Sequence, residues 1–142
     1  MKLKSFGCSF IFGTDLHDDS RLAPKATASN FTWPALLAQH NKWDYTCYAR
    51  PGAGNLEITE RLLSQLADVE PAVYVVAWTW IDRFGYIIPD RPHPHNWKSI
   101  MPVDSDARAE FYYKNIHGEY RDKLTSLIYI KTAIDALKAS GN

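Results

Sequence analysis

The apolar run Ala72–Trp78 constrains the fold of this chain more than any other feature. It is almost continuously apolar and rich in β-branched and aromatic residues, which is the composition of a strand. A strand with one face in water would alternate polar and apolar residues, whereas an unbroken apolar run needs cover on both faces. The run therefore predicts a central strand with helices on both sides of its sheet.

The rest of the chain alternates between strand and helix patterns around this run. Apolar residues recur at helical spacing in three segments, and two glycine- or proline-containing turns separate the shorter elements. The expected elements are strands over residues 2–6, 44–48 and 72–78 and helices over residues 33–41, 56–67 and 106–139, with a candidate break at Gly118. Residues 8–28 and 79–104 show no regular pattern.

This order predicts an α/β domain over residues 1–142, with a parallel sheet and right-handed crossovers. Three strands are few for such a sheet, and no strand pattern follows the last helix. We therefore expect a sheet that is incomplete at its C-terminal side, with one edge of the third strand open. Because open edges pair with other chains, we expect a homo-oligomer or a second chain that completes the sheet.

Composition excludes several classes of function. The sixteen basic and sixteen acidic residues balance to a formal charge of zero, which argues against a nucleic-acid-binding protein with a broad basic surface. No apolar run is long enough to span a bilayer, and no signal peptide precedes the first strand. Cys8 and Cys47 lack metal-ligand spacing, so we expect reduced thiols, a cytoplasmic setting and no cofactor.

The candidate chemistry lies where strands end. Ser9 follows Gly7 directly after the first strand, at the edge of an open sheet where ligands bind. After the second strand come Pro51, Gly52 and Gly54. Glycine lets backbone amides approach a ligand closely, and preorganised amides stabilise an oxyanion. We therefore expect Ser9 and Gly54 to share a site, although a small residue at a turn and a plain glycine turn are the simpler interpretations.

The motif Gly7-Cys8-Ser9-Phe10 resembles the Gly-Asp-Ser-Leu block of the SGNH (GDSL) hydrolases, and Phe6–Gly13 resembles a divergent group common in bacteriophage genomes. The resemblance implies a three-layer flavodoxin-like sandwich, of which this chain would be about the first two-thirds. It also implies that Ser9 attacks an ester or acetyl carbonyl, on a small ester or an acylated carbohydrate. The Gly54 amide would then hold the oxyanion, and Cys8 would point into the sheet.

The remaining blocks of the family match this chain poorly. Trp78–Arg83 stands where the family has Gly-x-Asn-Asp, so Thr79 would replace the asparagine as an oxyanion donor and Asp82 would correspond to the final aspartate. The C-terminal Asp-x-x-His block is absent. Asp90-Arg91-Pro92-His93 has that spacing in a different place, and His93 is the one family-like base; triads do occur in different chain orders.

Other interpretations of these segments stay open. His93 and His95 with Asp90 could form a metal site, or they belong to a proline-rich loop. The aromatic residues of 79–104 could line a sugar or acyl pocket, or pack beneath the loop, and His117 is expected to have no chemical task. Two functions follow: a serine esterase that is weak or inactive as this chain alone, and a non-catalytic binding or virion-associated protein.

Overall fold

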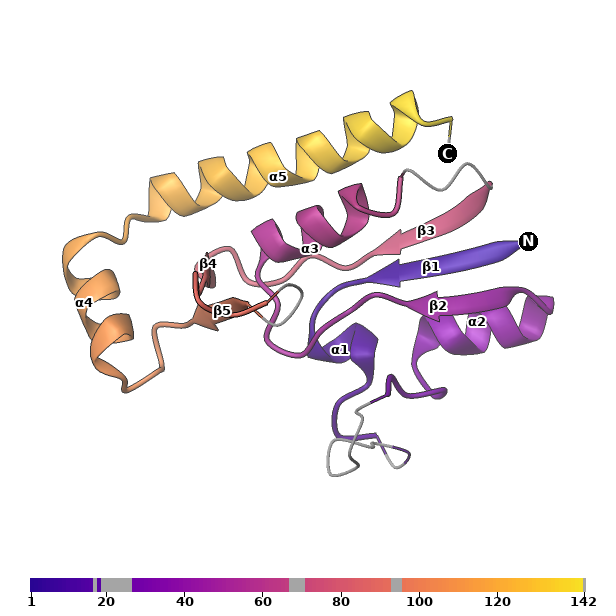
Figure 1. The fold of residues 1–142 in the computed structure, drawn as a ribbon, viewed down its shortest axis with the longest axis horizontal. Coiled ribbons are helices and arrows are strands. Elements are labelled where there is room, and N and C mark those ends of the chain that lie inside the picture. The colour runs from indigo at the N-terminus through magenta and orange to yellow at the C-terminus, as the bar shows by residue number, and fades with distance from the viewer. Residues whose placement is uncertain (17, 19–26, 67–70, 93–95, 142) are drawn as a thin grey trace.

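The computed structural model of this chain describes residues 1–16, 18, 27–66, 71–92 and 96–141 (Figure 1). The described elements alternate between strands and helices before the chain ends in two helices. In chain order they are β1 (Lys2–Phe6), α1 (Ser9–Phe12), α2 (Trp33–Asn41), β2 (Asp44–Cys47), α3 (Asn55–Leu63), β3 (Ala72–Val76), β4 (Phe84–Ile87), β5 (Trp97–Ile100), α4 (Ala107–Asn115) and α5 (Glu119–Ala139).

The parallel sheet has the strand order β2-β1-β3, so the α/β class and the parallel sheet are confirmed. Lys2 of β1 lies opposite Asp44 on one side and Ala72 on the other, and every pairing in this sheet is parallel. The first strand therefore occupies the centre, and β3, which the apolar run predicts as a central strand, lies at an edge of this sheet with one partner strand among the described residues. All five residues of β3 are only half-buried, as an edge strand would be.

Consecutive strand residues point to opposite sides of the sheet, and helices cover both of these sides. Phe6 packs with Ile58 and Leu62 of α3, and its ring stacks between Tyr48 and Tyr74 at centroid distances of 5.2 and 6.0 Å. Its neighbour Ser5 points the other way, where its hydroxyl lies 2.8 Å from that of Tyr45. Helix α2 contacts β1 and β2, while α5 lies outside α3 (Figure 1).

The expectation of no regular structure over residues 79–104 is wrong for part of the segment. Strands β4 and β5 form an antiparallel pair, with Phe84 opposite Ile100 and Ile87 opposite Trp97. Each strand has only four residues, which is too short for a periodicity to stand out. The pair is stabilised by packing against α4, where Ile100, Ala109 and Tyr112 form a second core.

The final helical region divides as the sequence indicates. Asp106 caps α4 by accepting from the amides of Arg108 and Ala109 at 2.9 and 3.1 Å, and α5 begins directly after Gly118. The Tyr113 hydroxyl donates to the carbonyls of Asp82 and Ile100, which fixes α4 against the β4–β5 pair. Burial raises the pKa of Tyr113 to about 12, so the hydroxyl keeps its proton to a higher pH than an ordinary tyrosine does.

The outer face of α5 is unusually apolar. Its exposed side chains include Tyr120, Leu124, Leu127, Ile128 and Ile134. These residues share a helix whose inner face packs on α3, so the domain presents an apolar helix face in addition to the open edge of β3. No helix in the described part of the chain is long and apolar enough to cross a membrane.

Candidate functional site

The three segments singled out by the sequence meet at one edge of the sheet. The Arg50 amide donates to the Gly7 carbonyl at 3.1 Å, and the Ala77 amide donates to the Phe6 carbonyl at 2.9 Å. These bonds continue the parallel pairing past the ends of β1, β2 and β3. As a result, the residues that follow each strand start from adjacent positions at the carboxyl edge, where open α/β sheets bind ligands.

Ser9 sits on a turn that only small residues permit. A side chain on Gly7 would bring its Cβ within 2.7 Å of the Ile11 side chain, so glycine is needed for α1 to follow β1 immediately. Ser9 is the first residue of α1 and is half-buried. Gly13 closes this short helix with φ of 83° and donates its amide to the Ser9 carbonyl at 2.8 Å.

Gly54 caps α3 from an extended conformation and is buried. A Cβ at this position would lie 3.4 Å from the Arg83 carbonyl oxygen and 3.6 Å from the Gly85 amide, so the backbone that enters β4 runs close beside it. Within the described residues, no hydrogen bond uses the Gly54 N–H. This amide is thus an uncommitted donor at the start of a helix, where the dipole favours negative charge.

Asn55 joins the second and third segments. Its Oδ1 accepts from the Thr79 amide at 2.8 Å, and its Nδ2 donates to the Thr79 carbonyl at 3.2 Å and to Ser126 Oγ at 3.3 Å. Asn55 is only 4% exposed. It is the first residue of α3, and its side-chain amide bonds both main-chain groups of Thr79. A polar residue directly after Gly54 was the available signal for this contact.

Thr79 is held in place with its hydroxyl unused. Its Oγ1 is buried and has no hydrogen-bond acceptor or donor among the described residues. The hydroxyl lies close enough to Cys8 to affect that thiol. Thr79 therefore places a buried hydroxyl beside Cys8 at the edge of the sheet, and its role as an oxyanion donor stays a prediction.

Cys8, rather than Ser9, lines the cavity at this edge. The cavity has a volume of about 470 Å³ and is walled by Phe10, Trp78, Thr79, Trp80 and Ile81. Burial acts to raise the pKa of the Cys8 thiol, but a hydrogen bond from the Phe10 amide, the nearby Thr79 hydroxyl and the Arg83 charge outweigh it and leave the pKa below its ordinary value. A low pKa makes a thiol reactive, so Cys8, which was expected to point into the sheet, instead adds a nucleophilic group to the lining of this cavity.

The aromatic residues after β3 serve both as the lining of a cavity and as core packing, the two arrangements expected from the sequence. Trp78 and Trp80 line the cavity beside Cys8, whereas Trp97 is buried beneath the β4–β5 pair and Phe84 stacks on Tyr112 at 4.1 Å between ring centroids. The part nearest the strand end is therefore available to a ligand, and the later part belongs to the core.

Asp82 lines a different pocket from Cys8. Together with Trp80 and Ile81 it lines a second pocket, which also holds His117 and Asp122. Its carbonyl accepts from the Tyr113 hydroxyl at 2.5 Å. Between described residues, no ion pair or hydrogen bond links the Asp82 carboxylate to Ser9. His93, the base that the sequence nominates, lies outside the described residues, as does His95.

An unpredicted histidine–carboxylate pair occupies that second pocket. His117 Nδ1 lies 2.9 Å from Oδ2 of Asp122, which is 4% exposed. The five-residue spacing across the start of α5 matches no catalytic motif, so the sequence held no signal for the pair. Figure 1 shows the α4–α5 turn well separated from α1, so the pair is not placed to act on Ser9.

No group of three or more metal-ligating side chains occurs in the part of the chain that the structure covers. Comparisons with protein-family models, with curated proteins and with solved structures find no match to this chain. The site is therefore argued from its own geometry.

We expect Asn55→Ala to lower the free energy of unfolding by about 2–4 kcal/mol, because it leaves both buried main-chain groups of Thr79 unpaired. Urea denaturation followed by circular dichroism measures this change. Asn41→Ala is the matched control: Asn41 is exposed and donates only to Leu37 within its own helix, so its loss should cost less than about 0.5 kcal/mol. Equal effects of the two substitutions would contradict the role given to Asn55.

We expect the pKa of the Cys8 thiol to lie below the ordinary value of a thiol. The ultraviolet absorbance of the thiolate, followed against pH in a Cys47→Ser variant, measures its pKa. Thr79→Val preserves the shape of the side chain and removes a hydroxyl that lowers the pKa, so the titration should move to higher pH. A Cys8 titration at or above the ordinary value would show that burial dominates instead.

Proposed function

We propose that this chain carries the nucleophile and oxyanion segments of an SGNH-type ester hydrolase, with Ser9 as the nucleophile, on a flavodoxin-like arrangement of strands. The observation that carries the proposal is the strand order β2-β1-β3. It brings the turns that hold Ser9, Gly54 and Thr79 to one edge of the sheet. Acyl transfer needs this combination of a hydroxyl nucleophile and preorganised neutral donors.

In the proposed reaction Ser9 Oγ attacks the carbonyl carbon of an O-acyl or acetyl ester and its proton passes to a base. The carbonyl electron pair moves onto oxygen, and that negative charge is met by the uncommitted Gly54 N–H and the spare Thr79 hydroxyl. Collapse of this intermediate expels the alcohol, which takes up the proton, and water then hydrolyses the acyl-serine. Trp78 and Trp80 offer flat apolar faces that suit an acyl chain or a sugar ring.

The base for this reaction is proposed to be His93, with Asp82 as the aspartate of the third segment. A hydroxyl without a base is a weak nucleophile, so we propose a low rate for this chain alone. A non-catalytic binding role is the second candidate. It is favoured by one observation, that Cys8 rather than Ser9 lines the aromatic cavity.

We expect Ser9→Ala to abolish labelling by a fluorophosphonate probe and to reduce hydrolysis of p-nitrophenyl acetate to the background rate. Mass spectrometry of the labelled protein identifies the modified residue. Cys8→Ser is the matched control, because it changes the adjacent nucleophile and leaves Ser9 in place. Labelling and turnover that are equal in wild type and Ser9→Ala would remove the enzyme proposal and leave the binding role.

We also propose that the domain associates, through the open edge of β3 and the apolar face of α5, with a second copy or with another chain that completes the sheet. Sedimentation velocity of the pure protein at micromolar concentration should then show a species larger than the monomer. Leu127→Glu would bury a charge in this contact, so it should weaken association by roughly tenfold or more.

Leu36→Glu provides the comparison, since Leu36 is similarly exposed but lies on α2. A clean monomer for the wild-type protein would exclude the second copy. If Leu36→Glu weakens association as much as Leu127→Glu does, the contact does not involve the outer face of α5.

A further inference from the structure

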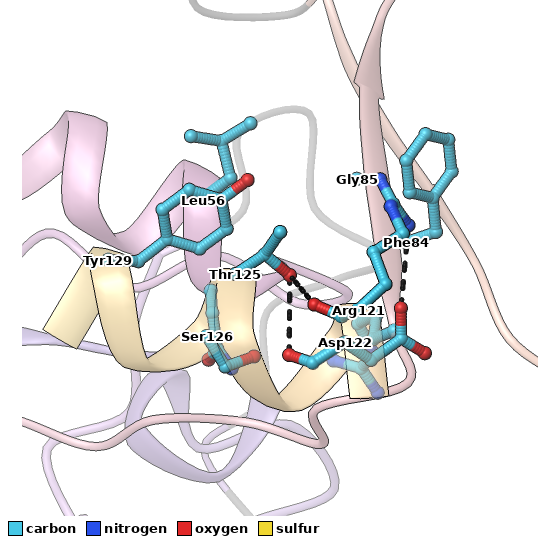
Figure 2. A pocket seen from close by; sticks show the side chains of 10 residues that line it. Leu56, Phe84, Gly85, Arg121, Asp122, Thr125, Ser126 and Tyr129 are labelled. Carbon is cyan, nitrogen blue, oxygen red and sulfur yellow. Dashed lines mark hydrogen bonds and ion pairs between the residues drawn. The ribbon is translucent and has the colours of Figure 1, made fainter. Parts of the chain in front are cut away.

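A third cavity lies between the start of α3, strand β4 and helix α5. Its volume is about 250 Å³. Figure 2 shows Thr125 and Tyr129 of α5 facing this space, with Leu56 of α3 and Phe84 of β4 at its borders. The cavity adjoins the candidate site, because Asn55 and Arg83 line it while Asn55 also bonds Thr79.

Arg83 brings to this cavity a positive charge that no described carboxylate neutralises. Its Nη1 donates to the Ala53 carbonyl and its Nη2 to the Met101 sulfur, both at 3.2 Å, and its Nε is buried without a partner. A thioether is a weak acceptor. The guanidinium is thus held by neutral groups, with part of its donor capacity unused.

Arg50 in the same chain shows what such a group ordinarily binds. Its Nε and Nη2 donate to the two carboxylate oxygens of Glu57, each at 2.5 Å. This side-on, two-point contact is the preferred geometry between arginine and a carboxylate or phosphate. The corresponding edge of Arg83 has only the Met101 sulfur, so Arg83 retains the capacity to hold an oxyanion.

A second guanidinium is fixed at the same cavity. Arg121 stacks on the rings of Phe84 and Tyr112 at 5.3 and 5.7 Å and donates to the Tyr112 hydroxyl. Asp122, the one acidic residue in the lining, lies 3.4 Å from Arg121 and also contacts His117. The acid is therefore shared between two partners, and the lining carries two arginine charges against one carboxylate.

Hydroxyl donors complete the lining. Ser126 is 4% exposed; its Oγ accepts from Asn55, which leaves its own proton without an acceptor among the described residues. The Tyr129 hydroxyl makes no hydrogen bond within the described part of the chain, and it borders the cavity (Figure 2). Spare hydroxyl donors beside an unneutralised guanidinium favour an acceptor-only ligand with negative charge.

We propose that this cavity binds a small oxyanion, a carboxylate or a phosphate, which the ester substrate carries. The link to the substrate rests on the proposed function, whereas the binding of the anion does not. Arg83 supplies the main charge and donors, Arg121 the second charge, and Ser126 and Tyr129 neutral donors. Because Asn55 of this cavity bonds Thr79 and the Arg83 backbone passes beside Gly54, an anion held here would place the neighbouring ester bond toward Gly54 and Thr79.

Calorimetric titration with inorganic phosphate and, separately, with acetate tests the anion site at an ionic strength kept constant with chloride. At least one of the two should bind saturably with one site per chain. Arg83→Gln should weaken that binding by about tenfold or more, because it removes a charge-assisted contact. Preference for phosphate or for acetate identifies which anion the substrate carries.

Arg91→Gln is the matched control, since it removes the same charge from an exposed position outside the cavity. Tyr129→Phe removes one hydroxyl but keeps the ring, and it should also weaken binding. This variant provides a second test if circular dichroism shows that Arg83→Gln does not fold. The proposal is overturned if neither anion saturates, or if Arg91→Gln weakens binding as much as the cavity variants do.

The same titration on Ser9→Ala separates this proposal from the proposed function. Anion binding should be unchanged in that variant, because Ser9 does not line the cavity. In the wild-type protein, anion binding without esterase activity would support the anion site and reject the hydrolase, whereas esterase activity without anion binding would reject the anion site alone.

Discussion

The side chain of Asn55 determines how the three strand ends are arranged. A parallel strand that leaves its sheet has unpaired main-chain groups, and buried main-chain groups need partners. Asn55 supplies both partners for Thr79 and donates a third hydrogen bond to Ser126 of α5. One buried amide therefore fixes the exit of β3, the start of α3 and the position of α5. The edge cavity and the arginine cavity both depend on this arrangement.

Close approach of backbones makes the edge a usable site. Gly7 lets α1 begin directly after β1, and Gly54 lets the backbone at Arg83 and Gly85 pass beside the start of α3. That passage places Arg83 in the lining of the arginine cavity and near enough to Cys8 for its charge to lower the pKa of the thiol. The electrostatics of the site thus follow from tight turns rather than from a cluster of charged residues in the sequence.

The sequence predicted the features that follow from local pattern. The helix at Trp33–Asn41, the break before Glu119 and the parallel sheet all have short-range signals in periodicity, proline and glycine. It could not predict contacts set by packing between distant segments. Asn55 meets Thr79 across 24 positions, and Asp122 meets His117 only because α4 and α5 turn at Gly118. The β4–β5 pair was missed because its stability comes from α4.

For the candidate site, residue types in the sequence predicted where the site lies better than they predicted which side chains determine its chemistry. Ser9, Gly54 and Thr79 follow the ends of adjacent strands, as glycine- and serine-rich turns after strands suggested. Among their neighbours, Cys8 supplies the thiol, Asn55 supplies the hydrogen bonds to main-chain groups, and Arg83 supplies the positive charge. Burial decides the properties of these three, and a single sequence does not encode burial at a turn.

The central claim is that Ser9 and the Gly54 amide act on the same atom at the edge of the sheet. A crystal structure of the protein after reaction with a small phosphonate ester tests this most directly, because the phosphonyl oxygen occupies the place of the oxyanion. The account predicts phosphorus bonded to Ser9 Oγ, with its oxygen about 3 Å from the Gly54 nitrogen. An adduct on Cys8, or one on Ser9 whose oxygen points away from Gly54, would contradict it.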